Sequence, residues 1–136
     1  MLEYLHHVNY VVSDLDEMMK YLKDTFDMDV ERINTSEKAR EAVYHAGVTE
    51  IQVVQPLDEE SASAKFLKER GPGLNHVAFG VTRIEELFQR AVDNGNEMRR
   101  KAVSVAPRGY KTMNIERSTS QGVGFQLIED IRPANA

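Results

Sequence analysis

The sequence predicts an α+β fold in which two βαβββ modules form an eight-stranded mixed sheet that curls into a cup, with helices outside. Three observations predict it: an internal repeat, an amphipathic helix pattern after each repeat, and three strand-like runs after each helix. The chain has 136 residues, of which 41% are hydrophobic and 29% charged. A single domain spanning 1–136 can therefore bury a core, and we place the two modules at about 4–56 and 73–130.

The repeat joins the two apolar runs that open the modules. Leu5-His6-His7-Val8 resembles Leu74-Asn75-His76-Val77, with leucine, histidine and valine at matching positions. Each run alternates apolar residues as a strand does, and each is followed by apolar residues at the i, i+3, i+4 spacing of a helix. We expect these helices at about 15–26 and 84–94, the first of them with Ser13 or Asp14 as a candidate N-cap.

Three short strand-like runs follow each helix. We expect strands at about 28–34, 40–46 and 49–55 in the first module, and at about 97–104, 110–116 and 122–129 in the second. The polar stretch between the modules predicts a linker helix at about 60–70, which ends in the turn Gly71-Pro72-Gly73.

Composition excludes several classes of function. Cysteine is absent, which excludes disulfides, cysteine–zinc sites and thiol nucleophiles. Seventeen basic and 22 acidic residues give a net charge of −5 without a basic run, so we expect no nucleic-acid partner. No apolar run approaches the roughly 20 residues of a membrane span, and the first residues lack a signal-peptide pattern. We therefore expect a cytoplasmic protein with a small-molecule substrate and no membrane contact.

Four polar residues interrupt otherwise apolar strands. His7 and His76 occupy equivalent points of the two opening strands, while Gln52 and Gln126 lie in the last strand of each module. If a pseudo-twofold relates the modules, the four side chains meet in one place. Imidazole nitrogens and amide oxygens are competent ligands for divalent metals. The alternative is that each histidine is a hydrogen-bonded strand residue and each glutamine faces water, but the pairing by repeat position favours a metal site.

Glu41 is a candidate acid/base residue. Strand parity places it on one face with Val43 and His45, away from Arg40. A carboxylate near a carbonyl held by the metal can remove the proton on the adjacent carbon. The alternative is an exposed strand glutamate that forms an ion pair with Arg40 or a lysine.

These residues resemble a known family. The stretch from Ala64 to Phe79, the strand that contains Gln52 with Pro56 and Leu57 after it, and the run from Gly122 to Leu127 resemble the vicinal oxygen chelate superfamily. This superfamily includes glyoxalases, bleomycin resistance proteins and dioxygenases. Within it, the chain is most similar to the methylmalonyl-CoA epimerases, across about residues 4–130.

The resemblance implies a homodimer with a divalent metal (Zn, Co, Mn or Ni) and an acyl-CoA substrate such as methylmalonyl-CoA. It places His7, Gln52 and His76 on three metal ligands of the epimerases and Glu41 on one of their two acid/base glutamates. Gln126 stands where the epimerases have a glutamate that is both ligand and second acid/base group. Because an amide cannot exchange a proton in this way, the departure puts two-base epimerisation in doubt and leaves a one-base isomerisation through Glu41.

Two other functions remain open at this point. A metal-free protein of the same fold that sequesters a small molecule would also lack the carboxylate at position 126. A glyoxalase-type lyase shares the fold, although it relies on a glutamate at that position. An extradiol dioxygenase ranks lower because its iron site needs two histidines and a carboxylate.

Overall fold

The computed structural model describes residues 1–106 and 109–130, which form the α+β fold that the sequence predicts. Its eight strands make one mixed sheet in the order β2-β3-β4-β1-β5-β8-β7-β6. The chain divides into two compact units. We call His7–Asn75 the N-unit, and Met1–His6 together with the residues from His76 onward the C-unit. The module limits at 4–56 and 73–130 stay a prediction.

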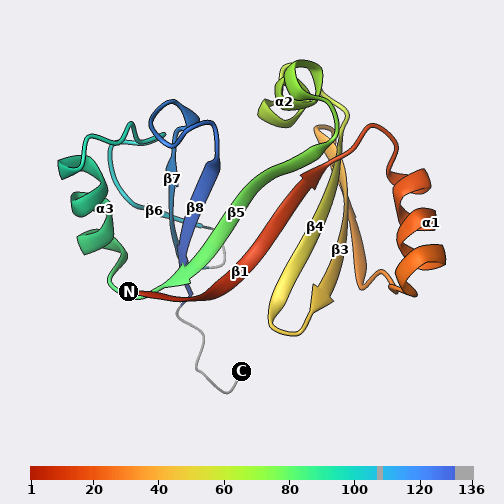
Figure 1. Ribbon diagram of the computed structural model, residues 1–136, viewed down its shortest axis with the longest axis horizontal. Helices are drawn as coiled ribbons and strands as arrows, with labels where there is room; N and C mark the ends of the chain where they lie inside the picture. Colours follow the sequence, from red (N-terminus) through yellow and green to blue (C-terminus); the bar gives the residue numbers. More distant parts are fainter. Residues whose placement is uncertain (107–108, 131–136) are drawn as a thin grey trace. The chain divides into compact units, whose positions relative to one another are not determined.

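The elements of the N-unit follow the predicted order (Figure 1). They are β1 (Leu2–Val11, of which His7 onward lies in this unit), α1 (Leu15–Phe26), β2 (Arg32–Thr35), β3 (Ala39–Ala46), β4 (Thr49–Pro56) and α2 (Ala62–Arg70). Strand β4 pairs with β1 in parallel and with β3 antiparallel, and β3 pairs antiparallel with β2.

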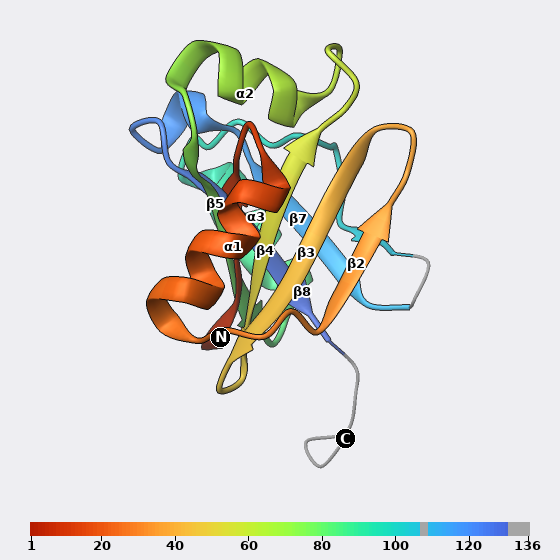
Figure 2. The ribbon, with the colours of Figure 1, turned by 90° about the vertical axis from the view of Figure 1, so that its right-hand side faces the viewer.

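Helix α1 covers one face of the N-unit sheet, as Figure 2 shows. The carboxylate of Asp14, one of the two predicted N-cap candidates, accepts a hydrogen bond from the Glu17 amide and caps the helix start. Leu15 and Leu22 on the apolar side of α1 then pack against Tyr44 and Val53 of the sheet. This packing fixes the direction of every side chain in β3 and β4, because alternate residues of a strand point to opposite faces.

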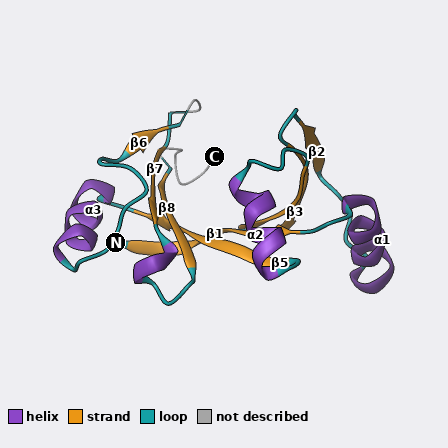
Figure 3. Ribbon diagram, turned by 90° about the horizontal axis from the view of Figure 1, so that it is seen from above, coloured by secondary structure: helices purple, strands orange, loops and turns teal. Residues whose placement is uncertain are grey.

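The C-unit repeats the arrangement with shorter strands (Figure 3). Its elements are β5 (Gly73–Val81, of which His76 onward lies in this unit), α3 (Ile84–Asp93), β6 (Ser104–Val105), β7 (Lys111–Ile115), the 3-10 helix η1 (Arg117–Thr119) and β8 (Gly124–Glu129). Strand β8 pairs with β5 in parallel and with β7 antiparallel. Helix α3 packs its apolar residues against Met113 and Leu127.

Two predicted strands are wrong in extent. The run expected at 97–104 is mostly a loop, and β6 keeps only Ser104 and Val105. The backbone here meets the end of β7 only in an isolated bridge between Met98 and Ile115, while the Thr119 hydroxyl accepts a hydrogen bond from the Glu97 amide. The run expected at 28–34 begins as a strand only at Arg32, because Asp27 has a left-handed conformation and the next amide, of Met28, bonds back to α1.

None of the helices in the described residues is both long enough and apolar enough to span a bilayer.

Candidate functional site

One face of the N-unit sheet carries three of the residues that the sequence predicts for the site. Gln52 alternates with Val53, which packs towards α1, so its side chain lies on the opposite face. Asn9 is the parallel register partner of Gln52, which places Asn9 and His7 on this same face. Glu41 pairs with Val54, two residues after Gln52, and lies there too. We call this surface the polar face of the N-unit.

A directed chain of hydrogen bonds crosses the polar face. The Asn75 amide donates to Oδ1 of Asn9 over 3.2 Å, and Nδ2 of Asn9 donates to Oε1 of Gln52 over 3.0 Å. Nε2 of Gln52 in turn donates to Oε1 of Glu50 over 3.1 Å. His7 and Asn9 are only 4% and 7% exposed, so their polar groups are withdrawn from water. Loss of a hydrogen bond here would leave a buried polar group without a partner, which is costly.

Glu41 is half-buried, and its carboxylate accepts a hydrogen bond from the Asn34 amide over 3.2 Å. Arg40 points to the other face, where its guanidinium forms an ion pair with Asp16 at 3.1 Å. The alternative in which Arg40 neutralises Glu41 is therefore wrong. The carboxylate shares its face with His7 and Gln52.

The C-unit carries the other two predicted residues on one face of its own sheet. Leu127 packs against α3, so the neighbouring Gln126 lies on the opposite face of the sheet. Gln126 is the parallel register partner of Ala78, which stands two residues after His76, so His76 lies on that face too. His76 and Gln126 are joined by a side-chain hydrogen bond. The pair lies on the face opposite α3.

Electrostatics keep the His76 imidazole neutral. Burial first, and then the positive charges of Arg117 and Arg99, lower the pKa of His76 from 6.5 to about 4, while the hydrogen bond to Gln126 acts in the opposite direction. At neutral pH the ring therefore keeps a nitrogen lone pair, which is the form that binds metals.

The two units present the same pair in the same register. Asn9, two residues after His7, pairs with Gln52, and Ala78, two residues after His76, pairs with Gln126. Each unit thus offers one imidazole and one carboxamide from adjacent parallel strands, a donor set that suits a divalent metal. The described residues contain no cluster of three or more His, Asp or Glu side chains suited to a metal.

Residues 6–113 match the family model of the Glyoxalase/Bleomycin resistance protein/Dioxygenase superfamily. The chain belongs to this superfamily. Its members share the paired arrangement of strands and helices found here, which confirms the resemblance drawn from the sequence. The match includes His7, Glu41, Gln52 and His76, whereas Gln126 lies beyond its end.

Similar proteins agree with this membership. The methylmalonyl-CoA epimerase of Mycobacterium tuberculosis is 27% identical with a TM-score of 0.81, and the match covers 96% of this chain and 90% of that one. The hypothetical protein BH1468 of Bacillus halodurans is 26% identical with a TM-score of 0.82, covering 96% of both chains. Among curated sequences, YqjC of Bacillus subtilis is 24% identical over 127 residues, 92% of this chain and 91% of that protein.

Sequence reasoning missed two residues of the polar face, Asn9 and Glu50. Both were detectable, because Asn9 stands two residues after His7 and Glu50 two residues before Gln52, so strand parity puts them on the same face as the predicted ligands. His45 also contacts this region. Its Nδ1 contacts the Glu31 carboxylate, and its Nε2 lies 3.9 Å from Oε2 of Glu50.

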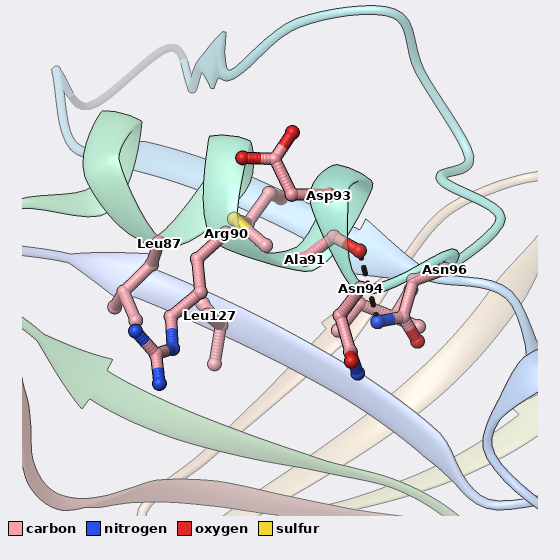
Figure 4. Close-up of a pocket in the computed structure, with 9 residues that line it drawn as sticks. Leu87, Arg90, Ala91, Asp93, Asn94, Asn96 and Leu127 are labelled. Carbon is pink, nitrogen blue, oxygen red and sulfur yellow. Dashed lines mark hydrogen bonds between the residues drawn. The ribbon is translucent and has the colours of Figure 1, made fainter.

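A pocket also opens at the C-terminal end of α3, on the face of the C-unit sheet opposite Gln126 (Figure 4). Its floor consists of core residues such as Leu87, Met113 and Leu127. At its rim the Asn96 amide donates to the Ala91 carbonyl over 3.0 Å, the dashed line of Figure 4. This polar group caps the helix end, and none of the predicted site residues of this superfamily member lines the pocket.

Proposed function

We propose that the protein is a metal-dependent isomerase or epimerase that moves a proton next to the carbonyl of an acyl-CoA, such as methylmalonyl-CoA. One observation carries the proposal: each unit holds an imidazole and a carboxamide in the same strand register, and Glu41 shares the face of the first pair. Likeness to the M. tuberculosis epimerase supports the substrate class. The proposal includes a homodimer in the cytoplasm, as the family resemblance implies.

The proposed ligands are His7, Gln52, His76 and Gln126. All four are neutral, and the low pKa of His76 supports its role because a protonated imidazole cannot bind a cation. A divalent ion supplies Lewis acidity that polarises a carbonyl and stabilises the negative charge that develops on its oxygen. A neutral ligand set leaves the charge of the ion uncompensated, so it should bind less tightly than in a site with a carboxylate and polarise more strongly.

Glu41 is the proposed acid/base residue. Its carboxylate takes the proton from the α-carbon and returns it, while the Asn34 amide keeps one oxygen oriented by its hydrogen bond. Gln126 stands where a second carboxylate would act on the opposite side of that carbon, and an amide does not act as an acid or base there. Glu41 alone therefore supports an isomerisation, in which the proton moves within one side of the substrate. Epimerisation needs a second acid, such as a water molecule, on the opposite side, because a proton returned to the same side restores the starting stereoisomer.

Proton exchange tests the proposal directly. The protein is loaded with Co²⁺ or Zn²⁺ and incubated with methylmalonyl-CoA and other acyl-CoA thioesters in heavy water, and α-deuterium is followed by NMR. We expect exchange that depends on both metal and protein. A metal-loaded protein that exchanges no α-proton in any of these thioesters would contradict the proposal.

A metal-free binding protein is the second candidate. Both amides already have partners within their units, since Gln52 bonds to Asn9 and Gln126 to His76, and this favours a polar face that is complete without an ion. Metal titration separates the candidates. A binding protein would take up acyl-CoA with the same affinity in chelator as in added metal, whereas the isomerase would lose its activity in chelator.

A further inference from the structure

The orientation of the Gln52 amide decides whether this residue can serve as a ligand. A carboxamide presents an oxygen in one orientation and an NH₂ group in the other, and only the oxygen can bind a cation. The group that fixes the amide orientation therefore controls whether Gln52 can bind a metal ion. In the N-unit the amide contacts two side chains, Asn9 through its oxygen and Glu50 through its nitrogen.

Of these two contacts, the one with Glu50 specifies the orientation of the Gln52 amide. Asn9 is itself an amide and can donate or accept after a flip, but an ionised carboxylate only accepts. The Gln52 NH₂ group must therefore face Glu50, which turns Oε1 towards Asn9, the neighbour of His7 on the same strand face.

Two further groups hold Glu50 in place. Nη2 of Arg32 lies 3.4 Å from Oε1 of Glu50, and Nε2 of His45 lies 3.9 Å from Oε2. The Glu50 side chain is only 18% exposed, so these contacts restrict a carboxylate that is largely withdrawn from solvent. Its position is set by β4, which makes it the direct register partner of both His7 and His45.

We propose that Glu50 is a positioning residue that presents the Gln52 oxygen to the metal. The inference rests on the proposed function, since it assumes that Gln52 is a ligand. Groups that orient ligands are commonly worth tenfold to a hundredfold in metal affinity. The C-unit has no such group at the matching position, because the register partner of His76 is Gly124.

A double-mutant cycle on the full chain tests the role. Co²⁺ affinity is measured by calorimetry for the wild type, Glu50→Gln, Gln52→Ala and the double variant, with titrations extended into the millimolar range. We expect Glu50→Gln to weaken binding by about 10- to 100-fold when Gln52 is present. In the Gln52→Ala background the same change should alter affinity by about twofold or less, since the group to be oriented is gone.

A matched control is Glu69→Gln on the exposed side of α2, which removes the same charge and should leave affinity unchanged. Equal losses for Glu50→Gln in both backgrounds would mean that Glu50 only attracts the cation, and would overturn the inference. Unchanged binding in Glu50→Gln would also overturn it. No Co²⁺ binding by the wild type would instead refute the metal in the proposed function.

A second measurement needs no variant at position 50. In the metal-free wild type, the Gln52 side-chain amide protons are assigned by NMR through their loss in Gln52→Ala. We expect one of them downfield of the exposed glutamine amides, as a hydrogen bond to a carboxylate requires. A Gln52 signal at the position of the exposed amides would overturn the inference even if Glu50→Gln failed to fold.

Discussion

The polar faces of the two units differ in their neighbours although their histidine and glutamine share one register. In the N-unit, Asn9 and Glu50 flank Gln52 and hold its amide at both ends. In the C-unit the matching positions are Ala78 and Gly124, and Gln126 bonds directly to His76. The same strand register therefore holds the glutamine amide between two polar neighbours in the N-unit, and pairs it with the histidine in the C-unit.

The acid/base position differs in the same way. Glu41 pairs with the residue two after Gln52, and the equivalent residue of the C-unit, which pairs with the residue two after Gln126, is Thr112. Only the N-unit has a carboxylate at this point. The shared strand register sets which face each side chain lies on, while the residues at these positions decide which unit offers a carboxylate.

The largest expected effect tests this asymmetry. Glu41→Gln should slow α-proton exchange by about 10²- to 10⁴-fold, because it removes the proposed general base. The matched change in the C-unit, Thr112→Val, should slow exchange by less than about threefold. Both rates are read from deuterium incorporation at saturating metal. Equal effects of the two substitutions would contradict the assignment of acid/base chemistry to the N-unit.

The second prediction concerns the burial of His76, which belongs to the C-unit. Its folded pKa of about 4 lies below the ordinary value of 6.5, so the unfolded chain binds the proton first as pH falls. The free energy of unfolding should therefore fall by about 3 kcal/mol between pH 6.5 and 4 on account of His76 alone.

The check is to measure the free energy of unfolding in urea as a function of pH for the wild type and for His76→Asn, each in chelator. The difference between the two pH profiles gives the contribution of His76. Above about pH 7.5 the two profiles should run parallel, since His76 is then mostly neutral in both folded and unfolded chains. Profiles that stay parallel down to pH 4 would show that His76 is not buried as described.

The smallest expected effect concerns the missing carboxylate. Gln126→Glu should tighten Co²⁺ binding by about tenfold or more, because it adds a negative ligand in the unit that has no carboxylate at the neighbouring position. Gln52→Glu should gain less, since the new carboxylate would lie beside Glu50 and repel it. A larger gain at position 52 than at position 126 would contradict the difference between the two faces.

Much of the architecture was predictable, because the repeat and the period of the apolar residues depend on local sequence. Helix α1 covers the range expected from Leu15 to Phe26, and β4 begins and ends within a residue of its prediction. The short extent of β6 was not predictable, since the residues before it form only an isolated bridge from Met98 to Ile115, and the Glu97 amide donates to Thr119, which is distant in sequence. The pairing of Gln52 with Asn9 follows from strand register, which alternation alone does not give.

The central proposal is that His7, Gln52, His76 and Gln126 bind a single ion. Metal analysis and Co²⁺ calorimetry of the wild type, His7→Ala and His76→Ala test it most directly. We predict one ion per chain in the wild type, and a loss of more than about 100-fold in affinity when either histidine is removed. Binding that persists at wild-type affinity without one of these imidazoles, or a wild type that takes up no ion, would contradict it.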